Sequence, residues 1–360
     1  MFGTRIGAVR PAAALSLAAA CVLALAACSS SGGSSSDGPS QAATGAQALA
    51  GQTITVYSGQ HEQTVKALAA DFEKRTGVKV DLRSGDEAEL ANQILQEGKA
   101  SPADVFYAEN PPALTVLEEQ GLLAAVQSDT LKSVPAGDSS PKGDWVGVSA
   151  RTAAFLAAEG KPADTAPPAS VRDLAKPEWK GRLGIAPSET DFAPIVTRMI
   201  KTDGADATKQ WLLGLKANAK SYDSNESLSA AINSGEVEGG VIDHYYFYRL
   251  RDEKTAAQTH AKLHYFTKTD PGALVDVSGA GVLKGGKHQQ AAQAFLAYLD
   301  SAPAQTLIAT SESYEYPLVA GVKGKAELPA LDTVGQVASA ADLGDGKEAL
   351  QLLQDTGLLA

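Results

Sequence analysis

Short apolar runs alternate with helical patterns along much of this sequence, and this alternation limits the possible folds. The runs at 53–57, 78–82 and 104–107 predict three strands. Between them, apolar residues recur at helical spacing: Val65, Leu68, Ala69 and Phe72 before the second strand, then Leu90, Ile94 and Leu95. A strand–helix–strand–helix–strand order predicts parallel strands with helices on the sheet faces.

A second unit of this kind is predicted between about 152 and 270, with strands at 183–186 and 239–242. The long apolar segments 145–155 and 272–283 are interpreted as two strands that cross between the units. The predicted fold class is therefore α/β, with two lobes that close as a hinge, each a mostly parallel sheet with helices on both faces. The expected limits are 51–150 plus about 276–325 for lobe 1, and about 151–275 plus about 326–360 for lobe 2.

The N-terminal segment is expected to direct export rather than to fold. Arg5 and Arg10 precede an uncharged run, 11–27, that is short for a membrane span, so residues 1–27 read as a signal peptide. The sequence around Cys28 resembles the lipobox of bacterial lipoproteins, which predicts lipidation of Cys28; the alternative is a chance cysteine in an ordinary signal peptide. Residues 28–50, rich in Ser and Gly, would form a flexible tether to the outer face of the cytoplasmic membrane.

Charge and cysteine content exclude several classes of function. The 31 basic and 42 acidic residues give a formal charge of −11, which argues against nucleic-acid binding through phosphate neutralisation. Of the two cysteines, Cys21 lies in the predicted signal peptide and Cys28 would carry the lipid. The mature chain would then have no thiol for catalysis or zinc binding.

Polar residues follow the predicted strands, where ligands bind in open parallel sheets. In the first unit these are Ser58–His61, Ser84–Gly85 and Glu109–Asn110. His61 and Glu109 are therefore expected at one edge, although 48 positions separate them. The second unit places the loop 187–191 and the segment 243–248 in corresponding positions, ahead of a polar helix that starts near Arg249.

Four consecutive aromatic residues, Tyr245–Tyr248, end the last of these strands. A phenol has a pKa of roughly 10, so a metal must carry a high charge to displace its proton. Trivalent iron meets this condition, whereas zinc favours imidazoles and thiolates, and calcium favours several carboxylates and carbonyls. Consecutive aromatics also occur in packed strands and at helix starts, and both interpretations stay open at this stage.

The sequence resembles the ferric-ion-binding substrate-binding proteins of bacterial iron ABC transporters over essentially all of 53–360. The matching segments are Ile54–His61, Pro102–Glu109, Asp243–Tyr248, Asp270–Val275, Ser278–Ala280 and Glu315–Leu318. The resemblance implies a periplasmic-binding-protein type II fold in which His61, Glu109, Tyr245 and Tyr246 bind Fe³⁺. It also implies delivery of the ion to an ABC permease and its ATPase.

Four protein ligands leave two of the six positions around an octahedral Fe³⁺ ion. The better-known relatives fill these positions with a small anion. The residues implied here, as anion or supporting groups, are Asn110, Arg151, Ser188, Thr190, Asn225 and Asp243. Glu189, Asp191 and Asp243 bring negative charge that would repel phosphate. Carbonate, water or a carboxylate of the protein are the alternatives. Asp243, Asn225 and Asp191 are also residue types that favour helix N-caps.

Other functions are weighed against iron capture. The sequence has no Gly-x-Ser-x-Gly elbow, phosphate loop or dinucleotide fingerprint, so an enzyme is the less favoured class. The second choice is a binding protein of the same fold for a polyamine, thiamine or a phosphonate. Delivery to a permease is compatible with a monomer.

Overall fold

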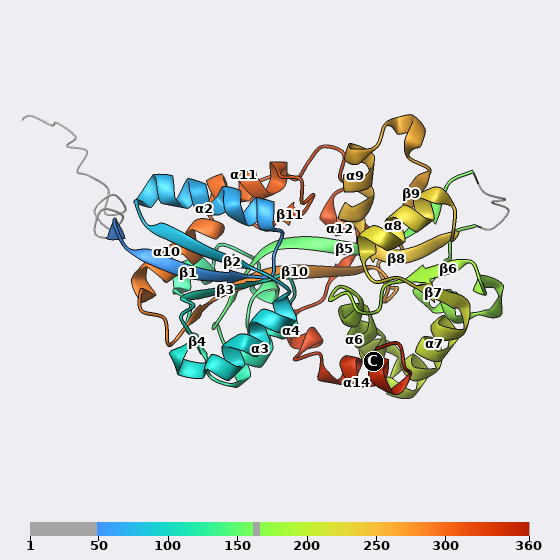
Figure 1. Ribbon diagram of the computed structural model, residues 1–360, viewed down its shortest axis with the longest axis horizontal. Coiled ribbons are helices and arrows are strands. Elements are labelled where there is room, and N and C mark those ends of the chain that lie inside the picture. Colours follow the sequence, from blue (N-terminus) through green and yellow to red (C-terminus); the bar gives the residue numbers. More distant parts are fainter. Residues whose placement is uncertain (1–48, 161–165, 360) are drawn as a thin grey trace, which may run out of the picture. The chain divides into compact units, whose positions relative to one another are not determined.

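The computed structural model describes residues 49–160 and 166–359 (Figure 1). The predicted signal peptide, Cys28 and most of the tether lie outside these residues. Within the described part of the chain, no helix has the length and apolar character to cross a membrane.

The first lobe is built on three parallel strands, as the sequence pattern predicts. Strand β1 (Thr53–Ser58) pairs with β2 (Lys79–Ser84) on one side and β3 (Val105–Ala108) on the other. The helices between and after these strands are α2 (Glu62–Thr76), α3 (Glu87–Glu97) and α4 (Pro111–Glu119). Helix α2 ends at Gly77, whose φ of 72° is a left-handed conformation that glycine adopts without strain.

Two long strands connect the lobes, which confirms the interpretation of the two apolar segments. Strand β5 (Val146–Ala158) and strand β10 (Leu274–Leu283) are antiparallel neighbours, with Arg151 opposite Asp276. Figure 1 shows them running side by side from the elements around β1 and β3 to those around β8. The main strand order is β2-β1-β3-β10-β5-β8-β6-β7.

The second lobe repeats the pattern of short strands followed by helices. Strand β8 (Gly239–Asp243) is antiparallel to β5 and parallel to β6 (Leu183–Ile185), which is parallel to β7 (Ala219–Ser221). The other elements of this region are α6 (Phe192–Asp203), α7 (Ala205–Asn218), α8 (Asn225–Ser234), α9 (His244–Glu253) and β9 (Ala261–His264).

One boundary differs from the sequence prediction in a way that bears on the site. Helix α9 begins at His244, directly after β8, and not near Arg249. The tyrosine pair thus occupies the first turn of a helix rather than a loop. Aromatic residues lose only a few tenths of a kcal/mol against good helix formers, and burial of Tyr245 and Tyr248 in the second lobe outweighs that cost.

The remaining elements complete the two cores. Phe295 and Leu296 of α10 (Gln289–Leu299) join the core of β1 and α2, whereas Leu353 of α14 (Lys347–Asp355) joins the core of α6 and α7. Because these helices join different cores, we propose that lobe 1 comprises 51–150 plus about 276–325, and that lobe 2 comprises about 151–275 plus about 326–360. The other short elements are β4 (Leu123–Ala124), α5 (Ser128–Leu131), α11 (Ala302–Thr310), β11 (Tyr316–Pro317), α12 (Leu331–Val334), β12 (Gln336–Val337) and α13 (Ala340–Leu343), with 3-10 turns at Gly98–Ala100, Ala136–Asp138, Val171–Ala175, Pro177–Trp179 and Ala256–Gln258.

Candidate metal site

His61 and Glu109 meet at the carboxyl ends of β1 and β3, as the strand order predicts. His61 precedes the first residue of α2, and Glu109 follows the last residue of β3. The His61 Nε2 atom lies 3.6 Å from Glu109 Oε1, and each side chain is 15% exposed. The first lobe therefore presents an imidazole and a carboxylate together, both mostly buried.

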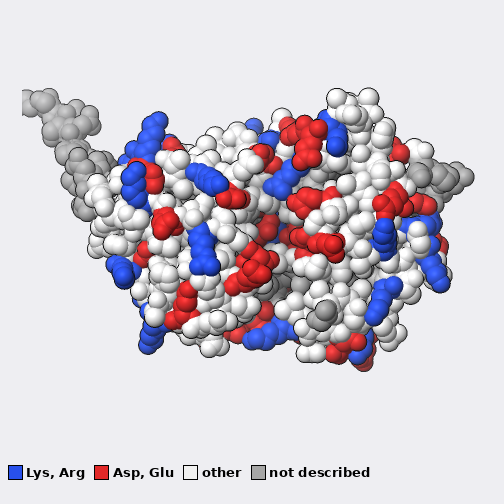
Figure 2. Space-filling model, in the orientation of Figure 1, with Lys and Arg blue, Asp and Glu red and all other residues white. Residues whose placement is uncertain are grey.

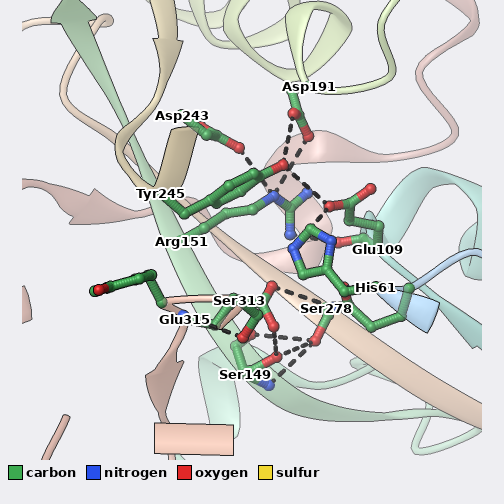
Figure 3. Close-up of polar contacts among 12 residues, drawn as sticks. His61, Glu109, Ser149, Arg151, Asp191, Asp243, Tyr245, Ser278, Ser313 and Glu315 are labelled. Atoms are coloured by element: carbon green, nitrogen blue, oxygen red, sulfur yellow. Dashed lines mark hydrogen bonds and ion pairs between the residues drawn. The ribbon is translucent and has the colours of Figure 1, made fainter. Parts of the chain in front are cut away.

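The second lobe brings Tyr245 against this pair (Figure 3). The Tyr245 hydroxyl lies 3.2 Å from Glu109 Oε1 and 3.1 Å from Asp191 Oδ2, and the His61 ring packs edge-on at 4.9 Å between centroids. A neutral phenol has one proton and donates it to one acceptor at a time. The Tyr245 hydroxyl thus faces two carboxyl oxygens, one from each lobe, and can donate to only one of them.

Tyr246 lies beside Tyr245, with ring centroids 4.4 Å apart. Tyr245 is fully buried and Tyr246 is 7% exposed. The guanidinium of Arg249, one turn later in α9, stacks over both rings at 4.7 and 5.9 Å. His61, Tyr246 and Arg249 also line a cavity of about 580 Å³, so this cavity reaches two of the residues named for metal binding.

Asp191 contributes more than the sequence analysis assigned to it. It occupies the N-cap position of α6 without a capping hydrogen bond from its side chain. Instead, Oδ2 faces the Tyr245 hydroxyl and accepts a hydrogen bond from Asn225 Nδ2 at 3.3 Å, while Oδ1 lies 3.4 Å from Arg151 Nε. The available signal was its place after β6, at the same sheet edge as Tyr245.

Arg151 lies at the centre of the buried charges, between the two lobes. Only 1% of its side chain is exposed, and its Nε donates to Asp243 Oδ2 at 3.1 Å. The other guanidinium nitrogens donate to the Glu109 carbonyl and to Asn110 Oδ1, and one lies 3.6 Å from Asp276 Oδ2. One cation therefore faces three carboxyl groups, those of Asp191, Asp243 and Asp276.

The other residues named for an anion role have different surroundings. Asn110 is held by Glu87, whose carboxylate accepts from both its backbone and its side-chain N–H groups. Asn225 is the first residue of α8, and Ser224 is the N-cap, accepting from Ser227 N. Ser188, which is exposed, and Thr190, which is half-buried, line a separate groove of about 310 Å³.

Burial sets the protonation of the central groups. It raises the pKa of Tyr245 and of Tyr246 well above the ordinary value, and the neighbouring carboxylates of Asp191 and Glu109 add to this effect. Burial likewise raises the pKa of Glu109 and lowers the pKa of His61, in the latter case with help from Arg249. At neutral pH His61 is thus neutral and carries a free lone pair.

The described His, Cys, Asp and Glu side chains do not form a metal site by themselves. Among residues 49–160 and 166–359, no three His, Cys, Asp or Glu side chains group closely enough to hold a metal ion by themselves. Figure 2 shows Asp and Glu side chains gathered around a hollow near the middle of one face, so a cation is attracted toward the molecule there.

Comparison with known proteins agrees with this chemistry. Residues 54–311 match the family described as bacterial extracellular solute-binding protein. The chain is 40% identical over 319 residues to the Fe(3+)-binding periplasmic protein of Serratia marcescens, covering 88% of this chain and 94% of that one. The chain belongs to the ferric-ion-binding family of solute-binding proteins. This solute-binding protein is also 36% identical over 311 residues to the major ferric iron-binding protein of Neisseria meningitidis, covering 85% and 93% of the two chains.

A solved structure of the family has the same fold. Iron-bound HitA from Pseudomonas aeruginosa superimposes with a TM-score of 0.81 at 40% identity, covering 85% of this solute-binding protein and 99% of HitA. The expected two-lobed type II fold is thereby confirmed.

Proposed function

We propose that this solute-binding protein captures Fe³⁺ between its lobes, outside the cytoplasm, and delivers it to an ABC permease and its ATPase. The observation that carries the proposal is the Tyr245 hydroxyl, placed within 3.2 Å of carboxylates from both lobes. A hard trivalent ion at this point would replace the phenol protons and favour the charged form of the neighbouring carboxyl groups. The relatives named above for ferric binding support this choice of ion.

The proposed ligands are His61, Glu109, Tyr245 and Tyr246, joined by Asp191. Asp191 Oδ2 lies 3.1 Å from the Tyr245 hydroxyl, so a carboxylate of the protein would fill a position that the sequence analysis left open to a small anion such as carbonate. Ligands from both lobes make binding and closure one event. We also propose that Cys28 carries a lipid anchor, and that the protein acts as a carrier without catalytic activity.

The test is the double variant Tyr245→Phe with Tyr246→Phe, titrated with ferric citrate. Ferric iron on phenolates gives a visible charge-transfer band, which zinc, calcium and organic ligands do not produce. We expect the wild-type protein to take up iron with this band and the double variant to bind none while remaining folded. Tyr248→Phe is the matched control, because its hydroxyl in the same helix donates to the Glu327 carbonyl, away from the site.

Two results would refute the proposal. One is stoichiometric iron uptake by the double variant. The other is a wild-type protein that stays colourless with ferric citrate but gains thermal stability from a polyamine, since this would identify an organic ligand instead.

A further inference from the structure

A short segment at 312–316 lies against the crossing strands, outside the proposed metal ligands. Its last residue, Tyr316, starts β11 and pairs with Ala150 of β5. Tyr314 has a φ of 57°, and no other non-glycine among the described residues has a positive φ. The neighbouring residues 314 and 315 contact different lobes.

Glu315 faces the first lobe. It is 1% exposed, and its Oε1 accepts a hydrogen bond from Gln60 Nε2 at 3.1 Å. The Gln60 side-chain oxygen in turn accepts from the backbone N–H of His61 at 2.7 Å. A chain of two hydrogen bonds therefore joins Glu315 to the backbone of a proposed iron ligand.

The second oxygen of Glu315 contacts the crossing strands themselves. Ser149 Oγ of β5 donates to Glu315 Oε2 at 2.9 Å and lies 2.6 Å from Ser278 Oγ of β10 (Figure 3). The strand pairing shifts register between Ser278 and Gly279. Glu315 is thus tied both to the strands that would bend on closure and to His61.

Tyr314 faces the second lobe. Its carbonyl accepts a hydrogen bond from His244 Nε2 at 2.9 Å, and its ring stacks on Tyr248 with centroids 5.0 Å apart. Its hydroxyl donates to Asp252 at 2.5 Å. His244, Tyr248 and Asp252 all belong to α9, the helix that carries Tyr245 and Tyr246.

We propose that Glu315 is a positioning residue for iron capture, which holds His61 in register with the tyrosine helix through Gln60. Tyr314 fixes the other end of the same segment to α9. This inference rests on the proposed function and assigns Glu315 a part in it. The segment contacts Gln60, directly before His61, and His244, directly before Tyr245. The proposed ligands of both lobes are therefore held by one segment that lies against the crossing strands.

The test is a double-mutant cycle of Glu315→Ala and His61→Ala, with ferric affinity measured by competition with citrate. Glu315→Ala alone is expected to weaken binding about tenfold, the loss typical of residues that orient metal ligands. In the His61→Ala background the same change should alter affinity by less than about twofold, because its effect passes through His61. Glu315→Gln should bind nearly as wild type, since its amide oxygen still accepts from Gln60.

Gln305→Ala is the matched control. Gln305 is fully buried, donates to the Val148 carbonyl at 2.7 Å and accepts from Leu318 N, so it also ties this region to β5 but does not contact Gln60. It should lower the melting temperature without changing affinity. If Glu315→Ala does not fold, Gln60→Leu replaces it in the cycle, because it removes both hydrogen bonds of the chain.

Additive losses in the cycle, or an unchanged affinity of folded Glu315→Ala or Gln60→Leu, would overturn the inference. A wild-type protein that develops no charge-transfer band would instead refute the proposed function, so the two failures are distinguishable.

Discussion

Arg151 Nε lies 3.1 Å from Asp243 Oδ2, deep between two lobes whose acidic residues outnumber this one buried cation. The pair joins a crossing strand to the end of β8, directly before the helix that carries the tyrosines. A guanidinium in this position orients carboxylates from three segments of the chain. Burial raises the pKa of Asp243 and of Asp276, so these carboxyl groups hold protons more tightly than they would in water.

Replacing Arg151 by Met should destabilise the protein strongly. Removing one partner of a buried ion pair typically costs about 3–5 kcal/mol, because the opposite charge stays buried without compensation. Denaturant unfolding of the iron-free protein would measure the loss. Lys66→Met is the control, since Lys66 pairs with Glu62 on the exposed face of α2, and about 1 kcal/mol or less is expected there. A loss for Arg151→Met no larger than the control would contradict this account of the buried charges.

Asp191→Asn should weaken ferric binding by about 100-fold, at the upper end of the range for groups around a metal. The charge-transfer band should persist, because both phenolates remain. Added bicarbonate should restore part of the affinity by occupying the vacated position. Glu189→Gln on the same loop is the control, since its carboxylate accepts from Asn225 N, and its affinity should not change. Wild-type affinity of Asp191→Asn would show that Asp191 is not a ligand.

Iron binding should release protons. Burial raises the pKa of Tyr245 and of Tyr246, so both phenols are protonated at neutral pH before the ion arrives. Each displaced proton makes affinity fall about tenfold for each unit by which the pH drops, so the two phenols alone give about 100-fold. Calorimetry in two buffers of different ionisation heat would give the number of protons released on binding. The iron would be supplied as a chelate whose own proton exchange is known, so that this contribution can be subtracted. Uptake without pH dependence would mean that the phenols do not lose their protons.

Asp300→Asn should change the pH dependence of stability without affecting iron. Asp300 is 5% exposed, and burial raises the pKa of its carboxyl well above the ordinary value, which the Ser133 hydroxyl offsets only in part. A raised folded-state pKa means that the folded protein holds the proton more tightly. The contribution to stability is therefore greatest below about pH 4 and declines as the pH rises toward the folded pKa.

The measurement is the difference in unfolding free energy between wild type and Asp300→Asn at pH 4.5 and pH 7.5. Wild type should lose stability relative to the variant as the pH rises. Asp129→Asn, at a site whose side chain is 97% exposed, provides the baseline. A difference that stays constant between the two pH values would contradict the prediction.

The local pattern of apolar residues was sufficient to predict the strands that border the site. The apolar runs of β1, β3 and β8 are short and sharply bounded, so the residues after them could be assigned to one edge of the sheet. The start of α9 was placed wrongly because buried packing of the tyrosines, which no local pattern shows, extends the helix back to His244. Helix α7 was not anticipated.

Beyond the meeting of His61 with Glu109, most contacts between distant segments could not be predicted. Asp191 was noted for its charge, as part of the loop 187–191 and as a possible cap. Its approach to Tyr245, 54 positions later in the chain, depends on how β6 and β8 pair. The contact between Gln60 and Glu315 spans 255 positions. The surroundings of Arg151 likewise require both crossing strands to be in register, which residue spacing does not encode.

The two crossing strands have a consequence for engineering the protein. Arg151 and Ser149 of β5, with Asp276 and Ser278 of β10, contact the polar groups around the site, so the connection between the lobes is not a neutral linker. A chimera that grafts one lobe onto a relative's would inherit mismatched partners at the junction. Such an exchange of lobes should give a folded protein only when β5, β10 and the segment 312–316 are all taken from the same parent protein.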